Sequence, residues 1–132
     1  MIPRRVLIVD DEPAVRRALD KALTRAGHTV FLAPSGEEAC EVLGVQRVDA
    51  ILMDLRMPSM SGQTLFHVIL SQWPPMASRI AVMSGDPDAE EEQEWLALYR
   101  LPVIAKPFEL ARVYEMVERL CVEAERRQAS SS

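Results

Sequence analysis

Residues 6–13 read VLIVDDEP, a run of four apolar residues followed by three acids and a proline. Four apolar residues are too few for a buried helix but are typical of a strand that is buried on both faces. Similar short runs, bounded by Asp, Pro, Gly or Ser, follow at 50–53 (AILM), 80–83 (IAVM) and 103–105 (VIA). We predict four buried strands here and a fifth, TVFLA at 29–33, at an edge of the sheet.

Amphipathic stretches separate these runs and predict helices. The first has apolar residues at helical spacing before Gly27, which we expect to cap its C-terminal end. These apolar residues are Val15, Ala18, Leu19, Ala22, Leu23 and Ala26. The last stretch repeats the spacing over 110–124, and shorter or less regular helices are expected at about 36–45, 62–72 and 88–100.

Strands and helices therefore alternate five times along the chain. Regular alternation with continuously apolar strands predicts an α/β fold, in which right-handed crossovers place helices on both faces of a doubly wound five-stranded parallel sheet. The sequence does not display the strand order. We adopt 2-1-3-4-5, the flavodoxin-like (βα)5 order, which is common for sheets of this size and places its ligand crevice between strands 1 and 3.

Length and composition limit the classes of protein that need to be considered. The 132 residues fit one domain, which we expect at 1–124, with 125–132 as a polar tail or the start of a linker. A net charge of −5 disfavours direct nucleic-acid binding. No apolar run approaches the ~20 residues that span a bilayer, so we expect no membrane contact and a cytoplasmic location. Cys40 and Cys121 lack the spacing of a zinc site or a disulfide framework.

Acidic side chains follow two of the predicted core strands. Asp10 and Asp11 come directly after the first strand, and Asp54 comes directly after AILM. If strands 1 and 3 are neighbours, these carboxylates converge, and their mutual repulsion favours a bound cation. Mg²⁺ suits such a site because it binds through a few carboxylates and leaves positions for phosphate oxygens. The acids thus indicate phosphoryl chemistry.

Two hydrogen-bond donors arrive at the same edge of the sheet. Ser84 ends the fourth strand and Lys106 ends the fifth. A hydroxyl and an ammonium can both donate to phosphate oxygens. Together with a carboxylate nucleophile and a metal ion, they supply the parts needed to make and hold an acyl phosphate, without a general base.

The ordered set of these motifs resembles the response regulator receiver domain family of two-component signal transduction over about residues 4–122. The resemblance rests on the Asp10-Asp11 pair, Asp54-Leu55-Arg56-Met57-Pro58 followed by Gly62, Ser84-Gly85, and Lys106-Pro107-Phe108. It implies that Asp54 is the phosphoacceptor and that Ser84 and Lys106 bind the phosphoryl oxygens. Asp10, Asp11, Asp54 and the backbone carbonyl of Arg56 would hold Mg²⁺, and the bond before Pro107 would be cis.

The resemblance also implies a function and partners. We expect a histidine kinase or a histidine phosphotransfer protein to phosphorylate Asp54, which would switch binding to an output protein or domain. The chain would assist its own phosphorylation and dephosphorylation without being a free-standing enzyme, as a monomer or weak dimer. It could instead be a receiver fragment of a hybrid sensor kinase or a transcriptional regulator. A pseudo-receiver would be expected to lack part of the site, and aspartyl-phosphate hydrolases carry a DxD motif, where residue 56 here is Arg.

Several of these residues also have structural interpretations. The acids before Pro13 could cap the first helix and complement its dipole. The acids between 86 and 94 favour the start of a helix, and we interpret them as a solvated face. His28 and His67 are interpreted as structural.

Two further positions predict how the site behaves. Arg56 and Asp86 have opposite charges and each lies two residues after a site residue, so we expect a salt bridge across the mouth of the pocket that slows hydrolysis. Val103 stands where similar receivers carry Tyr or Phe. Because valine is short and stiff, we expect the change on phosphorylation to reach the helix at 88–100 only weakly.

Overall fold

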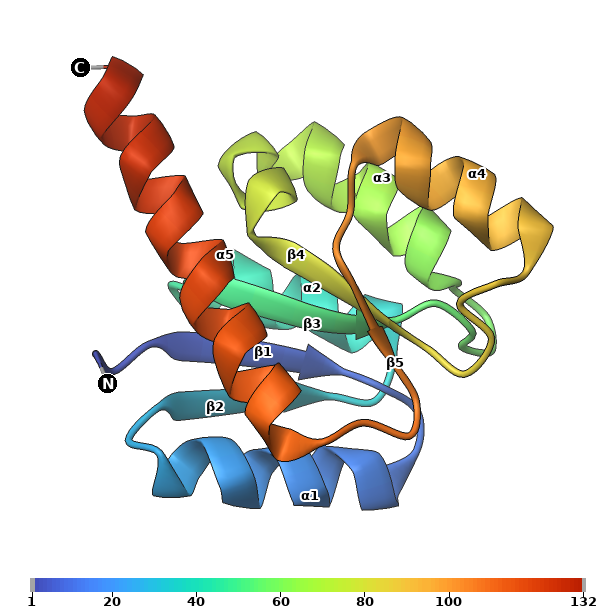
Figure 1. Cartoon of the computed structure of the whole chain (residues 1–132), viewed down its shortest axis with the longest axis horizontal. Helices are drawn as coiled ribbons and strands as arrows, with labels where there is room; N and C mark the ends of the chain where they lie inside the picture. The colour runs from blue at the N-terminus through green and yellow to red at the C-terminus, as the bar shows by residue number, and fades with distance from the viewer. Residues whose placement is uncertain (1, 132) are drawn as a thin grey trace.

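The computed structural model describes residues 2–131 and contains the predicted parallel sheet (Figure 1). Its strands run in the order β2-β1-β3-β4-β5, which confirms the order that we adopted. The strands are β1 (Arg5–Val9), β2 (Thr29–Ala33), β3 (Ala50–Asp54), β4 (Ile80–Ser84) and β5 (Val103–Ala105). The sequence TVFLA forms an edge strand, as expected, because β2 pairs only with β1.

The helices cover both faces of the sheet (Figure 1). The elements are α1 (Pro13–Arg25), α2 (Gly36–Val45), α3 (Gly62–Gln72), the short 3-10 helix η1 (Pro74–Arg79), α4 (Glu90–Tyr99) and α5 (Leu110–Ser131). Apolar side chains of α1 and α5 pack on one face, and those of α2, α3 and α4 pack on the other. The short helix η1 was not predicted from the sequence; it begins at a pair of prolines whose fixed φ suits a tight turn.

The double coverage explains why the strands are continuously apolar. In β1, Val6 and Ile8 pack against α1 and α5, while Leu7 and Val9 pack on the opposite face. All four are fully buried. Because alternate side chains point to opposite faces of a strand, a sheet covered on both sides needs apolar residues at every position.

Strand register brings the carboxyl ends of the core strands to one edge. Val9 pairs with Met53, Asp54 with Met83, and Ser84 with Ala105. The residues that follow β1 therefore lie beside the end of β3, and the end of β4 lies beside the end of β5. This is the edge at which doubly wound sheets bind ligands.

Two glycines shape the connections. Gly27 has a φ of 98° directly after α1 and its C-cap Ala26, which confirms a glycine-dependent end to that helix. Gly62 begins α3 against the end of β3: a Cβ there would contact the carbonyl oxygen of Asp54 and lie 2.8 Å from the Cα of Leu55. Only a residue without a side chain lets α3 start so close to the strand end.

Four rings join α3 to α4. Phe66 and His67 of α3 pack against Trp95 and Tyr99 of α4, with centroid separations of 5.1–6.2 Å between the two helices. The indole nitrogen of Trp95 donates to Nε2 of His67 at 3.4 Å. These four residues, called the aromatic cluster below, support the structural interpretation of His67. His28 is also structural, because its Nδ1 accepts a hydrogen bond from the backbone N–H of Arg4 at 2.9 Å.

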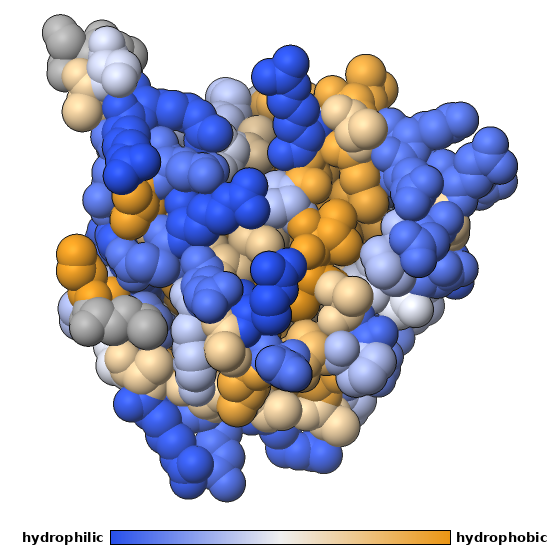
Figure 2. Space-filling view, in the orientation of Figure 1, coloured by the Kyte–Doolittle hydropathy of each residue, from blue (hydrophilic) through white to orange (hydrophobic). Residues whose placement is uncertain are grey.

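The last helix continues beyond the sheet. Residues 125–130 are exposed and helical, whereas the sequence predicted a polar tail or the start of a linker there. The domain boundary at residue 124 stays a prediction. The guanidinium of Arg4 forms ion pairs with Glu118 and Glu125, which ties this part of α5 to the start of β1. Figure 2 shows apolar surface between α5 and α4, with hydrophilic side chains on the outer turns of both. None of the helices within residues 2–131 is long and apolar enough to cross a membrane.

Candidate functional site

Three carboxylates meet at the carboxyl edge of the sheet. Asp10 follows β1 with no exposed surface, and Asp54 is the last residue of β3 and 6% exposed. Together with the exposed Glu12, each offers an oxygen within 4.8 Å of the others'. Glu12 is the N-cap of α1 but makes no capping hydrogen bond through its side chain, while its backbone N–H donates to Asp10 at 2.9 Å. The side chain of Glu12 therefore does not cap α1, whereas that of Asp10 contacts the backbone at the start of the helix.

Lys106 supplies the positive charge among these acids. Its Nζ lies 2.7 Å from Asp10 Oδ2, 3.5 Å from Asp54 Oδ2 and 3.8 Å from Glu12 Oε1. Its backbone N–H donates to the carbonyl of Ser84 at 2.7 Å, and the bond to Pro107 is cis, as the resemblance implied. Burial alone would lower the pKa of Lys106, but the hydrogen bond to Asp10 and the nearby carboxylates raise it. The ammonium stays charged at neutral pH.

Asp54 is the acid with the most perturbed proton affinity. Its pKa is raised from 3.8 to about 6, chiefly by burial and in part by repulsion from Asp10. Attraction to Lys106 and a hydrogen bond from the backbone N–H of Arg56, at 3.3 Å, limit the rise. At neutral pH the side chain is mostly a carboxylate that has lost much of its hydration and has few hydrogen bonds in exchange. Binding a cation or reacting with an electrophile would offset the negative charge that burial makes unfavourable.

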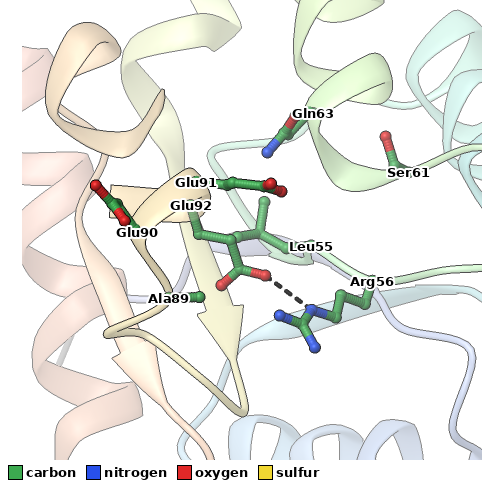
Figure 3. A pocket seen from close by; sticks show the side chains of 8 residues that line it. All are labelled: Leu55, Arg56, Ser61, Gln63, Ala89, Glu90, Glu91 and Glu92. Carbon is green, nitrogen blue, oxygen red and sulfur yellow. Dashed lines mark hydrogen bonds and ion pairs between the residues drawn. The ribbon is translucent and has the colours of Figure 1, made fainter. Parts of the chain in front are cut away.

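Ser84 ends β4 in a buried position beside an unexpected partner. Its hydroxyl donates to Glu92 Oε2 at 2.9 Å and accepts from the backbone N–H of Asp86 at 3.1 Å. Glu92 belongs to the first turn of α4 and is only 6% exposed. The other oxygen of Glu92 accepts from Arg56 Nε at 2.8 Å, the contact drawn in Figure 3.

The salt bridge predicted for Arg56 is thus formed with a different acid. Arg56 pairs with Glu92, and Asp86 contributes only a weaker attraction to the guanidinium. The prediction considered acids near Ser84 in sequence, whereas α4 brings Glu92 across from the other side of the pocket. The interpretation of the acids at 86–94 as a solvated face is correspondingly wrong for Glu92, although Glu90, Glu91 and Glu94 are exposed.

Two adjoining hollows surround these groups. One, of about 340 Å³, contains the predicted catalytic residues and is lined by Glu12, Asp54, Leu55, Arg56, Ser84, Gly85, Asp86 and Lys106. The other, of about 590 Å³, lies between the loop after β3 and the start of α4 (Figure 3). Arg56 and Leu55 line both hollows, so the side chain of Arg56 lies at the border between them.

Comparison with known proteins assigns this arrangement to a family. Residues 6–118 match the model of the response regulator receiver domain. The chain belongs to this family. Within the chain, Asp54, Ser84 and Lys106 line one hollow, and Asp10 lies beside them with its Oδ2 2.7 Å from Lys106 Nζ.

Individual relatives agree with this assignment. The receiver domain is 40% identical over 88 residues to the transcriptional regulatory protein GlrR of Escherichia coli strain K12, an alignment covering 66% of this chain and 20% of that protein. It is 27% identical to sporulation initiation phosphotransferase F of Bacillus subtilis, covering 90% and 94%. The response regulator protein TrrA of Thermotoga maritima, solved in complex with Mg²⁺-BeF, superposes with a TM-score of 0.76 at 25% identity, covering 89% and 98%. The chain spans about a fifth of the length of GlrR.

The donor set of the receiver domain fits a Mg²⁺ ion. Hard carboxylate oxygens from two buried aspartates converge beside a hollow of about 340 Å³, and oxygen ligands with free positions are what Mg²⁺ requires. The structure brings Glu12 to the group with Asp10 and Asp54, whereas we predicted Asp11, which lies outside the group and is partly exposed. The metal-binding roles of Asp11 and of the Arg56 carbonyl stay predictions.

Glu92 is the residue that the sequence analysis missed, although a signal was present. Glu92, Leu96 and Tyr99 are spaced i, i+4 and i+7, which places Glu92 on the same helical face as buried Leu96. An acid at an apolar position of an amphipathic helix needs a partner. The neighbouring acids concealed this signal, because a run of Glu residues is usually solvent-exposed.

Proposed function

We propose that this receiver domain accepts a phosphoryl group on Asp54 from a phosphohistidine of a histidine kinase or phosphotransfer protein. The observation that carries the proposal is the placement of Asp54: a buried strand-end carboxylate, with Lys106 at 3.5 Å, in a hollow that is also lined by Ser84. The carboxylate, the hydroxyl and the ammonium each lie at the end of a strand or directly after it. Groups that are already held close to the reacting carboxylate lower the entropic cost of phosphoryl transfer.

The transfer follows from these groups. A carboxylate oxygen of Asp54 attacks phosphorus, a P–O bond forms, and the P–N bond to the donor histidine breaks with its electron pair going to the imidazole. Lys106 and the Ser84 hydroxyl donate to phosphoryl oxygens, and Asp54 becomes a mixed anhydride. Mg²⁺, held by Asp10, Asp54 and a further acid, would offset negative charge on the phosphoryl oxygens. Water attacking the anhydride later restores the carboxylate and releases phosphate.

The proposed role is that of a switch and not of a free-standing enzyme. Phosphorylation replaces one carboxylate charge by a larger, more highly charged group, which biases the receiver domain toward a state with different affinity for an output protein or domain. Which output protein or domain responds is a property of the whole protein and not of the receiver domain alone. The segment of GlrR that matches this chain makes up about a fifth of that transcriptional regulatory protein. We propose that the receiver domain described here likewise controls the output of a transcriptional regulator.

Acetyl phosphate provides the direct test, because it needs no partner protein. With Mg²⁺ present, we expect the intact mass to rise by one phosphoryl group, with acetate as the leaving group. Asp54→Asn should gain nothing, while Asp88→Asn, which changes an exposed aspartate, should react like the wild type. No adduct on the wild type, or an equal adduct on Asp54→Asn, would refute the assignment of the acceptor.

A further inference from the structure

The contacts of Glu92 link the phosphoacceptor pocket to α4. The hydrogen bond from Ser84 to Glu92 and the ion pair of Arg56 with Glu92 are called the Glu92 bridge below. It joins the end of β4, the loop after β3 and the first turn of α4 through one buried carboxylate. Both its donors line the hollow that contains Asp54.

We propose that Glu92 is a positioning residue that holds Ser84 and Arg56 away from the acceptor and fixes α4, and that phosphorylation of Asp54 breaks the Glu92 bridge and releases α4. The proposal rests on the proposed function, since it requires a phosphoryl group on Asp54. It adds a residue from outside the acceptor pocket to the machinery of the switch.

The hydroxyl of Ser84 can donate only one hydrogen bond. A serine hydroxyl carries one proton and can donate once. In the unphosphorylated protein that proton is given to Glu92, with the hydroxyl oxygen accepting from the backbone of Asp86. Ser84 therefore cannot donate to a phosphoryl oxygen on Asp54 until it leaves Glu92.

A phosphoryl group on Asp54 competes with Glu92 for Arg56. A phosphoryl group offers three strongly accepting oxygens with up to two negative charges, where Glu92 offers one shared charge. The side chain of Arg56 is 68% exposed, so it can turn toward the new anion without unpacking the core. The phosphoryl group also repels the carboxylate of Glu92, which contacts Ser84 and Arg56 of the acceptor hollow from outside it. All three effects weaken the Glu92 bridge.

Glu92 is the acid that is left behind. A buried carboxylate without its donors is strongly unfavourable, so Glu92 must regain water or another donor. Glu92 lies in the first turn of α4, whose N-cap, Ala89, makes no side-chain hydrogen bond. Without a side-chain cap the turn keeps only its backbone hydrogen bonds, so we expect it to move with Glu92. Loss of the bridge therefore displaces the N-terminal half of α4.

This route does not pass through residue 103. The small side chain of Val103 led us to expect only a weak change in the helix at 88–100, and that expectation considered a single route between Ser84 and the helix. Glu92 connects them directly, so under this proposal the response of α4 does not depend on residue 103. We now expect the amides of residues 89–95 to respond strongly to phosphorylation.

The test compares Glu92→Gln with Glu94→Gln, which removes the same charge from an exposed position on the same helix. With Mg²⁺ and acetyl phosphate, Glu92→Gln should be phosphorylated about three- to tenfold faster than the wild type, as expected for loss of one hydrogen-bonded contact in the resting state. Glu94→Gln should stay within about twofold. Equal rates for the two variants would overturn the proposal.

Two further measurements identify the route. In amide spectra, free Glu92→Gln should be shifted at residues 89–95 toward the positions that the wild type reaches with Mg²⁺ and beryllofluoride. In a Ser84→Ala background, Glu92→Gln should lose most of its effect on rate. An effect that persists in full there would assign it to charge alone and reject the bridge. If the wild type gains no adduct at all, the proposed function fails, whereas a normal adduct with unshifted Glu92→Gln amides rejects only the bridge.

Discussion

Replacing Asp54 by Asn should stabilise the metal-free domain at neutral pH. The pKa of Asp54 rises from 3.8 to about 6 in the folded state, chiefly through burial. Each tenfold change in proton affinity is worth about 1.4 kcal/mol, so ionised Asp54 costs the fold about 3 kcal/mol at neutral pH. Asparagine has nearly the same shape, never ionises and escapes this cost.

The pH dependence identifies the cause. Between pH 3.8 and about 6, the folded state binds more protons at Asp54 than the unfolded state, so the wild type loses stability as pH rises through this range. The advantage of Asp54→Asn should be about 1 kcal/mol at pH 4.5 and about 3 kcal/mol at pH 7.5, after subtraction of any constant difference between the side chains.

Urea unfolding in the presence of a chelator, at a series of pH values, measures this difference. Asp88→Asn removes an exposed carboxylate and should show a small difference that hardly varies with pH. Mg²⁺ should then stabilise the wild type much more than Asp54→Asn, because a cation offsets the charge that burial penalises. A difference between Asp54→Asn and wild type that stays flat from pH 4.5 to 7.5 would refute the reasoning.

Three other changes test the site. Asp10→Ala combined with Asp11→Ala should abolish Mg²⁺ binding in a titration while preserving or raising thermal stability, through relief of repulsion; unaltered binding would place the ion elsewhere. Arg56→Ala should modestly shorten the lifetime of phospho-Asp54, measured by loss of the adduct mass, since its guanidinium borders the pocket; an equal or longer lifetime contradicts shielding. Gly62→Ala should lower both the unfolding midpoint and the phosphorylation rate, because its Cβ would meet backbone at the end of β3; wild-type values for both would show that the loop adapts.

The fold was predictable because the decisive signals are local. Short apolar runs, helical spacing and Gly27 each depend on neighbouring residues, and the boundaries of α2 and α3 came out as expected. The meeting of Asp10, Asp54, Ser84 and Lys106 was also predictable, since parallel strands place their carboxyl ends at one edge.

The details that were missed depend on contacts between distant elements. Whether Arg56 pairs with Asp86 or Glu92 is decided by where α4 begins and how it lies against the loop after β3. Likewise, the choice between Asp11 and Glu12 for the acidic group depends on the direction of the chain as it leaves β1. Motif spacing contains neither piece of information.

The aromatic cluster determines what kind of motion α4 can make. Trp95 and Tyr99 lie in the second half of the helix and pack against Phe66 and His67 of α3, whereas Glu92 lies near the opposite end. Ring contacts to α3 hold the second half of the helix, and the side-chain contacts of Glu92 hold its first turn, so loss of the Glu92 contacts would let the helix rotate about its second half. The first turn of α4 would then move while the half that carries Trp95 and Tyr99 stays in place. A partner that binds the start of α4 would therefore meet a helix with a changed tilt, and not one that has shifted as a whole.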